Sequence, residues 1–406
     1  MISRRQLVST TVASTTLACV PKVFASDGFN MQQYVDELRE LVAIDSKTGY
    51  EEGANKVIAI FEQRFKSIGW TVTLHQCEGR GKALVATSKP DQSKYDVVVS
   101  AHADTVQPVG YAAKYPLKIE GHIAHGAGVG DDKSSLLAAW WLVKGLPKAI
   151  TDKLNIAFII NPGEEASAPS TLKFFDEQAK KTSIALVYEP GREGDNKNGF
   201  VKVRKGSTPL TIRFQGKAAH AGNNPQDGRN AVYAMALAIP QIAAIQKKYP
   251  GVTLNSDLVK GGTAPNTIAA EAEVVFDFRY TDNQTRDKVL AEVKGMCDKG
   301  FMDGVRSELV VKAIGSALPE TEASRKLMAM VEKASAELGQ PKPKWFSVGG
   351  ASDGNKLAAH GAAVVCAMGV VSGNLHDPEH EWSDLSTVHP RIKLGTRVIE
   401  MIAAGK

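Results

Sequence analysis

The sequence predicts an α/β protein with a mostly parallel sheet flanked by helices, interrupted by an inserted α+β domain. Three short runs rich in Val and Ile, 96–100, 154–160 and 184–188, are bounded by polar residues, as buried parallel strands are. An apolar segment with a helical pattern, 134–146, lies between the first two runs, so strands and helices alternate. A length of 406 residues is too great for one ordinary core and suits two domains.

Further helices and one more strand are expected around this sheet. Apolar periodicity over 31–44 and 53–68 predicts surface helices that pack on one face of the sheet. A fourth apolar run, 362–368, follows much later and is expected to return to the sheet. The sheet domain is therefore expected to combine two segments, 26–198 and 316–406.

The segment between them, 199–315, has a different pattern of expected strands and helices. It contains two expected antiparallel strands, a helix and a stretch that alternates apolar and polar residues, at 201–205, 209–216, 229–245 and 269–279. An acidic and glycine-rich run, 191–198, and the segment 317–319 flank it and are expected to act as hinges. We therefore expect a self-contained α+β insertion.

The N-terminus has the pattern of an export signal. Arg4 and Arg5 precede an uncharged stretch, 8–20, and small residues follow it before Ser26, so residues 1–25 are expected to be removed. The paired arginines resemble the twin-arginine type of signal, which exports folded proteins and implies a periplasmic or secreted product. The apolar stretch is shorter than the roughly 20 residues of a membrane span.

Charge and cysteine content narrow the class of protein. Loss of the signal removes three basic residues and no acidic one, which brings the net charge of +5 close to neutral and leaves no basic block for nucleic acid. The remaining cysteines, Cys77, Cys297 and Cys366, are odd in number and lack metal-like spacing, so no disulfide framework is expected. A lipid anchor at Cys19 is disfavoured, because Thr16 stands where such signals carry a branched apolar residue.

Acidic and histidine side chains follow the expected strands and the loop before the apolar helix. Ligands of open α/β sheets collect at the carboxyl ends of the strands. Any one of these groups is compatible with a solvated strand end or a helix cap. Five groups in equivalent places instead indicate a shared site, and they are His102-Ala103-Asp104, Asp131-Asp132-Lys133, Glu164-Glu165, Glu189-Pro190 and His376-Asp377.

The chemistry of these groups suits a metal. Residues two apart in a strand face the same way, so His102 and Asp104 would point into one site. Asp104 would then hold the second ring nitrogen of a metal-bound His102. Histidines and carboxylates together are typical zinc ligands.

Order and spacing of these motifs resemble the aminoacylase/carboxypeptidase-G family of co-catalytic zinc peptidases, from about residue 30 to the end of the chain. The resemblance rests on Ala101-His102-Ala103-Asp104-Thr105-Val106, Gly126-Ala127-Gly128 with Asp131-Asp132-Lys133, Glu164-Glu165, Glu189-Pro190 and His376. It implies that Asp131 bridges two zinc ions, with cobalt as a possible substitute. One ion would add Glu165 and His376, and the other His102 and Glu189.

The resemblance also implies a mechanism. Two metal ions acidify a bridging water to hydroxide near neutral pH. Glu164 would act as the general base and later pass the proton to the leaving amine, while Asp104 supports His102. A cis peptide bond is expected between Asp131 and Asp132. The chain departs from the family at Ser134-Ser135, where members commonly have glycine.

The insertion resembles the family's lid or dimerisation domain, which implies a homodimer. His220 would reach the partner's active site and steady the oxyanion. Asn266 and Arg279 match positions near the substrate carboxylate, which a guanidinium pairs with through two parallel hydrogen bonds. Gly350, in a glycine-rich loop, would allow close approach to substrate. Taken without the family, a structural histidine, a strand-end ion pair at Arg279 and an ordinary turn at Gly350 are the alternatives.

These expectations favour a zinc metallo-carboxypeptidase that hydrolyses the amide bond to a C-terminal amino acid, with glutamate as the residue that the resemblance implies. Its substrate would be a small peptide or an N-acyl amino acid. An N-acyl-amino-acid deacylase or a dipeptidase shares the same metal ligands and stays open. A periplasmic binding protein with a vestigial metal site is the remote alternative, which the complete set of ligands and base disfavours.

Overall fold

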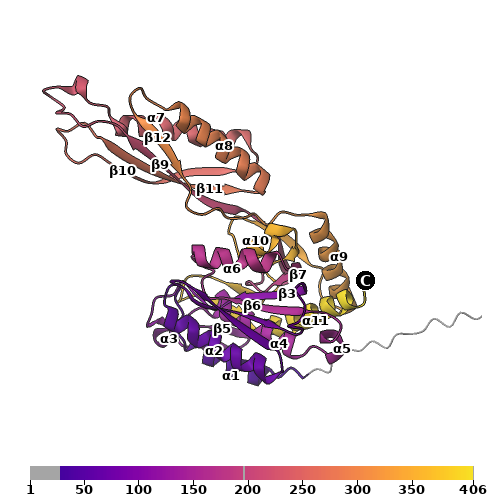
Figure 1. Cartoon of the computed structure of the whole chain (residues 1–406). Helices are drawn as coiled ribbons and strands as arrows, with labels where there is room; N and C mark the ends of the chain where they lie inside the picture. Colours follow the sequence, from indigo (N-terminus) through magenta and orange to yellow (C-terminus); the bar gives the residue numbers. More distant parts are fainter. Residues whose placement is uncertain (1–27, 195–196, 406) are drawn as a thin grey trace, which may run out of the picture.

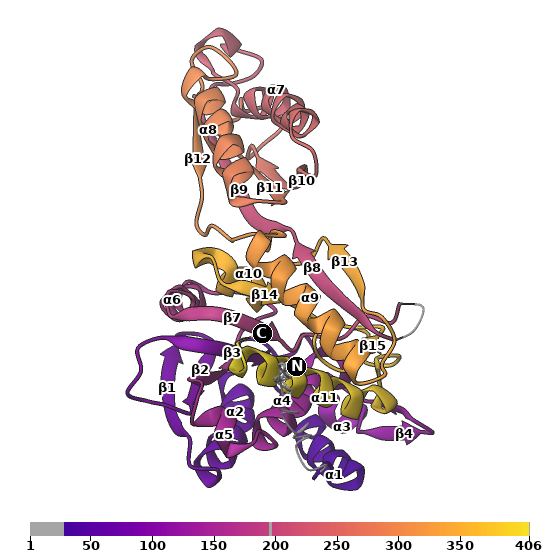
Figure 2. The same ribbon diagram turned by 90° about the vertical axis from the view of Figure 1, so that its right-hand side faces the viewer.

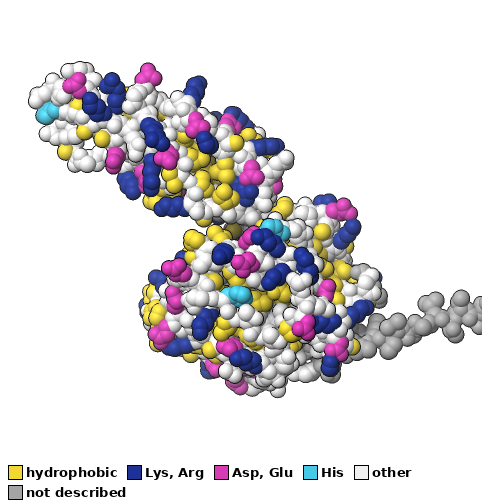
Figure 3. Space-filling model, in the orientation of Figure 1, with side chains coloured by type: hydrophobic (Ala, Val, Ile, Leu, Met, Phe, Trp, Pro, Cys, Tyr) yellow, Lys and Arg dark blue, Asp and Glu magenta, His cyan; other side chains and the backbone are white. Residues whose placement is uncertain are grey.

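The computed structural model describes residues 28–194 and 197–405. A narrow waist joins a larger domain to a smaller one, as Figures 1 and 3 show. A mostly parallel sheet with helices forms the larger domain and a separate antiparallel sheet forms the smaller one, which confirms the expected fold class. The expected export signal, residues 1–25, lies outside the described residues.

A six-stranded sheet with the order β1-β2-β6-β3-β7-β14 forms the centre of the larger domain. Its parallel strands are β3 (Tyr95–His102), β6 (Ile156–Asn161), β7 (Thr182–Val187) and β14 (Ala363–Val365). An antiparallel edge hairpin of β1 (Thr71–Cys77) and β2 (Gly81–Thr87), which was not predicted from the sequence, completes the sheet. The parallel strands are largely buried, and their apolar pattern made them visible in the sequence.

Helices cover both faces of this sheet (Figures 1 and 2). Alternate residues of β3 enter two different cores, with Val97 and Val99 on one face and Val98 on the other. The first face carries α1 (Met31–Val42), α2 (Glu51–Ser67), α4 (Ser134–Lys144), α9 (Glu322–Glu337) and α11 (Val388–Ala403). The second face carries α6 (Pro169–Ala179) and α10 (Asp353–Leu357). Two short helices, α3 (Tyr111–Lys114) and α5 (Lys148–Thr151), lie in connections.

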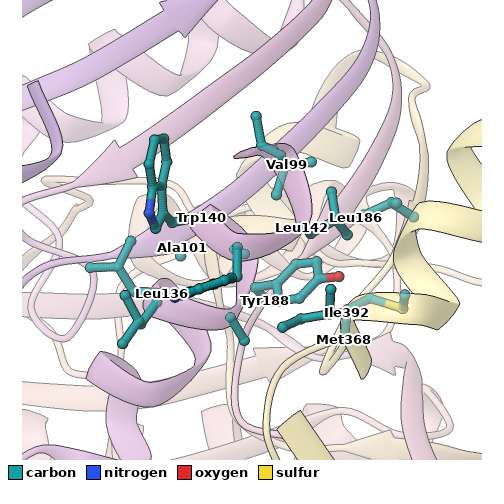
Figure 4. Close-up of a cluster of buried hydrophobic side chains, with 14 of the residues drawn as sticks. Val99, Ala101, Leu136, Trp140, Leu142, Leu186, Tyr188, Met368 and Ile392 are labelled. Atoms are coloured by element: carbon teal, nitrogen blue, oxygen red, sulfur yellow. The ribbon is translucent and has the colours of Figure 1, made fainter. Parts of the chain in front are cut away.

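Helix α4 is apolar on all sides because it is buried on all sides. Figure 4 shows Trp140 and Leu142 of α4 within the same cluster as Val99 of β3 and Ile392 of α11. Leu136, near the beginning of α4, and Ala101, near the end of β3, belong to the same cluster, so these two ends lie close together. Asp131, in the wide turn just before α4, therefore lies near the last residue of β3.

A small sheet brings the C-terminal region to the same place. Its order is β15-β16-β5-β4, from β15 (Ser372–Gly373), β16 (Trp382–Asp384), β5 (Ile123–His125) and β4 (Lys118–Glu120). The pairing of β16 with β5 places residues 372–384 beside the turn that precedes α4. Segments about 250 positions apart in the chain thus meet at one edge of the domain.

The smaller domain, called the lid below, has its own core. Its antiparallel sheet has the order β10-β11-β9-β12, from β9 (Gly206–Gln215), β10 (Thr253–Gly261), β11 (Glu271–Tyr280) and β12 (Arg306–Val310). Helices α7 (Ala231–Ala244) and α8 (Asn283–Lys299) pack on one face of it. Within the described residues, no helix combines the length and the apolar character that crossing a membrane requires.

Strand β8 (Gly199–Arg204) corrects the expected domain boundary. It pairs in parallel with β13 (Lys344–Val348), and Phe200 is buried in the core of the larger domain. The chain enters the lid after Arg204 and returns near Leu318, where these two residues exchange backbone hydrogen bonds of 3.0 and 3.1 Å. The lid therefore begins later than residue 199, and the hinge expected at 191–198 is wrong. An apolar strand pattern does not reveal its partner strand, and only the pairing assigns β8.

Candidate metal centre

The structure brings the five expected metal ligands and Glu164 together at the carboxyl ends of the parallel strands. They come from several segments of the chain, which meet because neighbouring parallel strands end at the same edge of the sheet. His102 ends β3, Glu164 and Glu165 follow β6, and Glu189 follows β7. Asp131 precedes α4 and His376 follows β15.

One group of ligand atoms has the spacing of a zinc site. His376 Nε2 lies 3.5 Å from Asp131 Oδ2 and 3.4 Å from Glu165 Oε2. Ligand atoms about 2.1 Å from a tetrahedral zinc ion are about 3.4 Å from one another. The other carboxylate oxygen, Glu165 Oε1, is buried without a hydrogen-bond partner among the described residues. These three side chains therefore fit a bound cation.

A second group shares Asp131. His102 Nε2 lies 2.9 Å from Asp131 Oδ1 and 4.0 Å from Glu189 Oε1. Glu164 also offers an oxygen within 4.8 Å of the ligand atoms of His102 and Glu189. Of the two adjacent glutamates, Glu165 lies near His376, Asp131 and His102, whereas Glu164 lies near His102 and Glu189. A carboxylate in the position of Glu164 can bind a metal or accept a proton, and substitution separates these roles.

Asp104 contacts the residues that carry the ligand atoms and thereby orients them. Its main-chain oxygen lies 3.0 Å from His102 Nδ1, and its carboxylate oxygen Oδ1 lies 3.4 Å from the same atom. That contact assigns the ring proton to Nδ1 and leaves Nε2 for a metal. The carboxylate also accepts the backbone N–H groups of Glu164 and Glu165 and the hydroxyl of Thr48, at 2.9, 3.2 and 2.6 Å. Asp104 therefore positions three candidate site residues.

Crowded carboxylates set the electrostatics of the cluster. Burial raises the pKa of Glu164, and the nearby charge of Glu189 adds to the effect. Burial also raises the pKa of Glu189 to about 7. The pKa of Asp131 lies below its usual range, because hydrogen bonds from His102 and His376 outweigh its burial. A bound cation stabilises buried carboxylates that lie close together. The electrostatics of the cluster therefore agree with the distances between its ligand atoms, which fit a metal site.

Backbone conformation helps to aim His376. Its φ is 73°, in the left-handed region that residues with a side chain rarely adopt. Such strain costs on the order of 1–3 kcal/mol and persists where the surroundings enforce it. The turn is closed by the Asp377 backbone N–H, which donates to Asn374 O at 3.1 Å. The strained turn directs the imidazole toward Asp131 and Glu165.

The two serines that depart from the family pattern have defined contacts. Ser134 Oγ lies 2.8 Å from Ser383 Oγ, and Ser135 Oγ accepts the Val370 N–H at 3.2 Å. They therefore join the beginning of α4 to the C-terminal segment. The peptide bond between Asp131 and Asp132 is cis, which confirms that expectation.

Arg204 is a site residue that the sequence analysis missed. It is 4% exposed, and its guanidinium donates to Glu189 Oε2 at 3.2 Å. It also donates to the main-chain oxygens of Gly350 and Ala351, at 3.3 Å each. Arg204 thus joins a candidate ligand to the glycine-rich loop. The sequence carried no signal for this role, because an arginine at a strand end is usually solvated.

Packing against the described residues does not require a glycine at position 350. A Cβ built at Gly350 would meet nothing within 4 Å. Its carbonyl, rather than the absence of a side chain, is what the structure uses, through Arg204. The expected close approach of this loop to a substrate stays a prediction.

The structure does not bring His220 to the metal cluster of its own chain. His220 follows β9, whose ten residues lead away from the hinge over about 30 Å at roughly 3.4 Å per residue. Its Nδ1 accepts the N–H groups of Gly222 and Asn223 at 3.1 Å, so Nε2 carries the proton and is free to donate. Asn266 is a neighbour, because its carbonyl accepts the Ala221 N–H at 2.9 Å.

Arg279 lies at the hinge end of the lid sheet, opposite Ser207 in the strand register. Its Nε donates to both carboxylate oxygens of Asp277, at 2.9 and 3.0 Å. This is the strand-end ion pair that the sequence analysis gave as the alternative. A substrate carboxylate would have to compete with Asp277 for this guanidinium.

Comparison with known proteins adds independent findings. The sequence profile of the peptidase dimerisation domain (M20_dimer) matches residues 203–305, and that of peptidase family M28 matches residues 83–236. Carboxypeptidase G2 of Pseudomonas sp. (strain RS-16) is 27% identical over 379 residues, which are 92% of this chain and 90% of that protein. Succinyl-diaminopimelate desuccinylase of Psychrobacter sp. (strain PRwf-1) is 24% identical over 400 residues, 93% of this chain and 97% of that protein.

Solved structures share the fold. The aminopeptidase PepT of Bacillus cereus ATCC 10987 has a TM-score of 0.71 at 21% identity, covering 92% of this chain and 99% of that one. The M20 family metallo-carboxypeptidase Sso-CP2 of Sulfolobus solfataricus has a TM-score of 0.64 at 15% identity, covering 92% and 99%. The fold and the cluster of histidines and carboxylates define the class as metallopeptidase. Within that class, the chain is similar to M20 peptidases, through the dimerisation-domain match over residues 203–305 and the shared fold of Sso-CP2.

Proposed function

We propose that this protein is a dinuclear zinc carboxypeptidase that hydrolyses the amide bond to a C-terminal amino acid, with glutamate preferred. The observation that carries the proposal is the pair of ligand groups that share Asp131, with Glu164 beside them. Similarity to carboxypeptidase G2 over most of both chains supports release of a C-terminal residue. Preference for glutamate rests on the motif resemblance.

Bound zinc ions would polarise the scissile carbonyl and acidify a water. Glu164, whose pKa is raised by burial, would accept the proton of the attacking water and deliver it to the leaving amine. Asp104 would hold His102 and the backbone of both glutamates in place during this transfer. His220 of a second copy would donate its Nε2–H to the charge that develops on the carbonyl oxygen.

A homodimer through the lid is part of this proposal. Tyr233 and Leu237 of α7 are 64% and 49% exposed, and Leu258 and Val259 of β10 are 67% and 59% exposed. β10 is an edge strand of the lid sheet, and another strand can join the backbone groups along its outer side. The match to a peptidase dimerisation domain over 203–305 supports a second copy as the partner. A dimer would also give His220 an active site to reach.

Amide hydrolysis at an acyl group is the second candidate. Several similar proteins are succinyl-diaminopimelate desuccinylases, whose name describes removal of an acyl group. An N-acyl-amino-acid deacylase or a dipeptidase would use the same ligands and the same base. The difference between these functions lies in which side of the amide bond the site accommodates.

Product analysis separates these candidates. Zinc-loaded protein is incubated with peptides and N-acyl amino acids that differ only in the terminal residue, and the released products are quantified by mass spectrometry. Carboxypeptidase function predicts fastest release of C-terminal glutamate. Faster release of acyl groups than of amino acids from peptides would overturn it in favour of a deacylase. Glu164→Gln protein at the same zinc loading controls for contaminating hydrolases.

Export is proposed from the N-terminal pattern. Arg4→Lys with Arg5→Lys should retain the protein in the cytoplasm of its host, because the twin-arginine pathway reads the arginine pair. Cell fractionation measures this, and unchanged export would exclude this signal type.

A further inference from the structure

We propose that Glu381 is a positioning residue of the metal centre, which locks the turn carrying Asp131 to the segment carrying His376. The inference rests on the metallopeptidase function proposed above and deepens it. Glu381 is 1% exposed and is neither an expected ligand nor part of the acid–base chemistry. Its contacts account for how two ligands far apart in the chain are held together.

All four acceptor positions of the Glu381 carboxylate are used. Oε1 accepts the backbone N–H groups of Gly130 and Asp131 at 2.8 and 2.9 Å. Oε2 accepts the backbone N–H of Gly128 and the side-chain amide of Gln107, at 3.1 Å each. Among the described residues, hydrogen bonds to Glu381 thus come from N–H donors rather than from a cationic side chain. A carboxylate has about four such positions, so the group is satisfied without a metal.

Among the described residues, no strand pairs with the turn from 126 to 131. Gly128 has a φ of 69°, and a Cβ at Gly130 would lie 3.1 Å from Glu381 Oε1. Buried backbone N–H groups require acceptors, and here one carboxylate supplies them for three residues of the turn. Charge-assisted hydrogen bonds of this kind are stronger than neutral ones. The position of Asp131 therefore depends on Glu381.

The same residue closes the turn that follows His376. The Glu381 backbone N–H donates to Asp377 O at 2.7 Å. Its main chain thus holds the residue next to His376, while its side chain holds Asp131. Glu381 therefore contacts both segments whose side chains meet in the site, where His376 Nε2 lies 3.5 Å from Asp131 Oδ2. Ser383 also bonds this region, but to Val129 O rather than to Asp131.

Glu381→Gln tests the proposal with almost no change in shape. One carboxylate oxygen becomes an NH₂ donor that faces two N–H groups, so at least one backbone contact of the turn is lost. We expect zinc affinity to fall by about 10–100-fold, as for loss of other residues that orient metal ligands. Absorption bands of the cobalt-substituted protein should shift, because they report ligand geometry. Glu379→Gln, an exposed change of equal charge in the same segment, is the matched control and should leave both readouts unchanged.

Two further variants sharpen the test. Gln107→Glu combined with Glu381→Gln exchanges the two groups and restores the buried negative charge beside the turn, so zinc affinity should recover in part. If Glu381→Gln protein does not fold, Gln107→Ala removes a single donor, and a roughly threefold loss of zinc affinity is expected on the same grounds. Wild-type affinity in Gln107→Ala would then overturn the proposal.

The readouts separate this inference from the proposed function. Zinc affinity is measured by competition with a chromophoric chelator on protein whose folding is checked by circular dichroism, without any substrate. Folded Glu381→Gln protein with wild-type affinity and an unchanged cobalt spectrum would overturn the positioning role alone. Wild-type protein that binds no zinc would instead overturn the dinuclear zinc function itself.

Discussion

Arg204→Met removes the buried cation that faces Glu189, and its effect depends on whether metal is bound. Arg204 donates to Glu189 Oε2 at 3.2 Å and to Cys366 Sγ at 3.2 Å. Methionine keeps much of the length of this side chain but none of its charge. Burial already raises the pKa of Glu189 to about 7 with Arg204 beside it, so the variant should raise this pKa further.

The expected magnitudes follow from the geometry. Removal of one partner of a buried ion pair costs about 3–5 kcal/mol, which applies to metal-free protein at pH 8. With zinc bound, the ion compensates the carboxylate charge. The loss is then mainly the two hydrogen bonds to Gly350 and Ala351, about 1–3 kcal/mol together. The difference of about 2 kcal/mol corresponds to roughly 30-fold tighter zinc binding by the folded variant.

The pH dependence has a definite sign. Glu189 has a folded pKa above its unfolded value of about 4.3, so its protonated form is favoured by folding. The free energy of unfolding therefore falls as pH rises from the unfolded pKa through the folded one. Below pH 7 a neutral Glu189 needs no cation, and the cost of Arg204→Met in metal-free protein should shrink at pH 6.

Urea unfolding of chelator-treated and zinc-loaded protein measures these differences. Arg204→Lys keeps the charge without the fork of donors and should fall between wild type and Arg204→Met. Arg213→Met, which removes a half-exposed arginine of the lid that pairs with Glu273, is the surface control and should cost less than about 1 kcal/mol. Equal losses with and without zinc would refute the reasoning.

Three further outcomes are expected. Glu164→Gln should keep two zinc ions by elemental analysis while kcat falls by about 10²–10⁴-fold, and loss of an ion would instead make Glu164 a ligand. Mixed dimers of His220→Ala and Glu164→Gln chains should regain activity at one site per dimer, and inactivity of verified mixed dimers would contradict a role across the interface. Asp282→Ala should destabilise the lid by about 1 kcal/mol at pH 7 in urea unfolding, because Asp282 caps α8 and accepts the Thr285 N–H at 2.8 Å. Burial raises the Asp282 pKa, but the Thr285 hydrogen bonds outweigh it and lower the pKa, so this contribution is complete above about pH 4 and is lost below; an equal difference at pH 7 and pH 3 would argue against it.

Much of the catalytic domain could be predicted because its signals are local. Buried parallel strands such as β3 and β6 are continuous apolar runs, and the residues that follow them lie at one edge of the sheet. His102 and Glu164-Glu165 were therefore visible as candidate site residues before any contact was known. The edge hairpin β1–β2 was missed, because β1 is only partly buried and lacks such a run.

Residues that support the site were not predictable in the same way. Glu381 lies in a polar stretch that is typical of a solvated turn, yet it contacts Gly128 across 253 positions. Arg204 likewise ends a strand that was assigned to the wrong domain. A hydrogen bond between distant polar residues leaves no periodicity in the sequence, so nothing local distinguishes these side chains from exposed ones.

The sequence by itself determined the fold class and the set of histidines and carboxylates at the strand ends, because apolar periodicity and strand-end position are local properties. Only the tertiary structure decided the domain of β8, the pairing of Arg279 with Asp277 and the distance of His220 from its own metal cluster. Only the tertiary structure also revealed the contacts of Glu381 and Arg204. These depend on which segments meet in space, and the packing of α4 against β3 and the pairing of β16 with β5 bring those segments together.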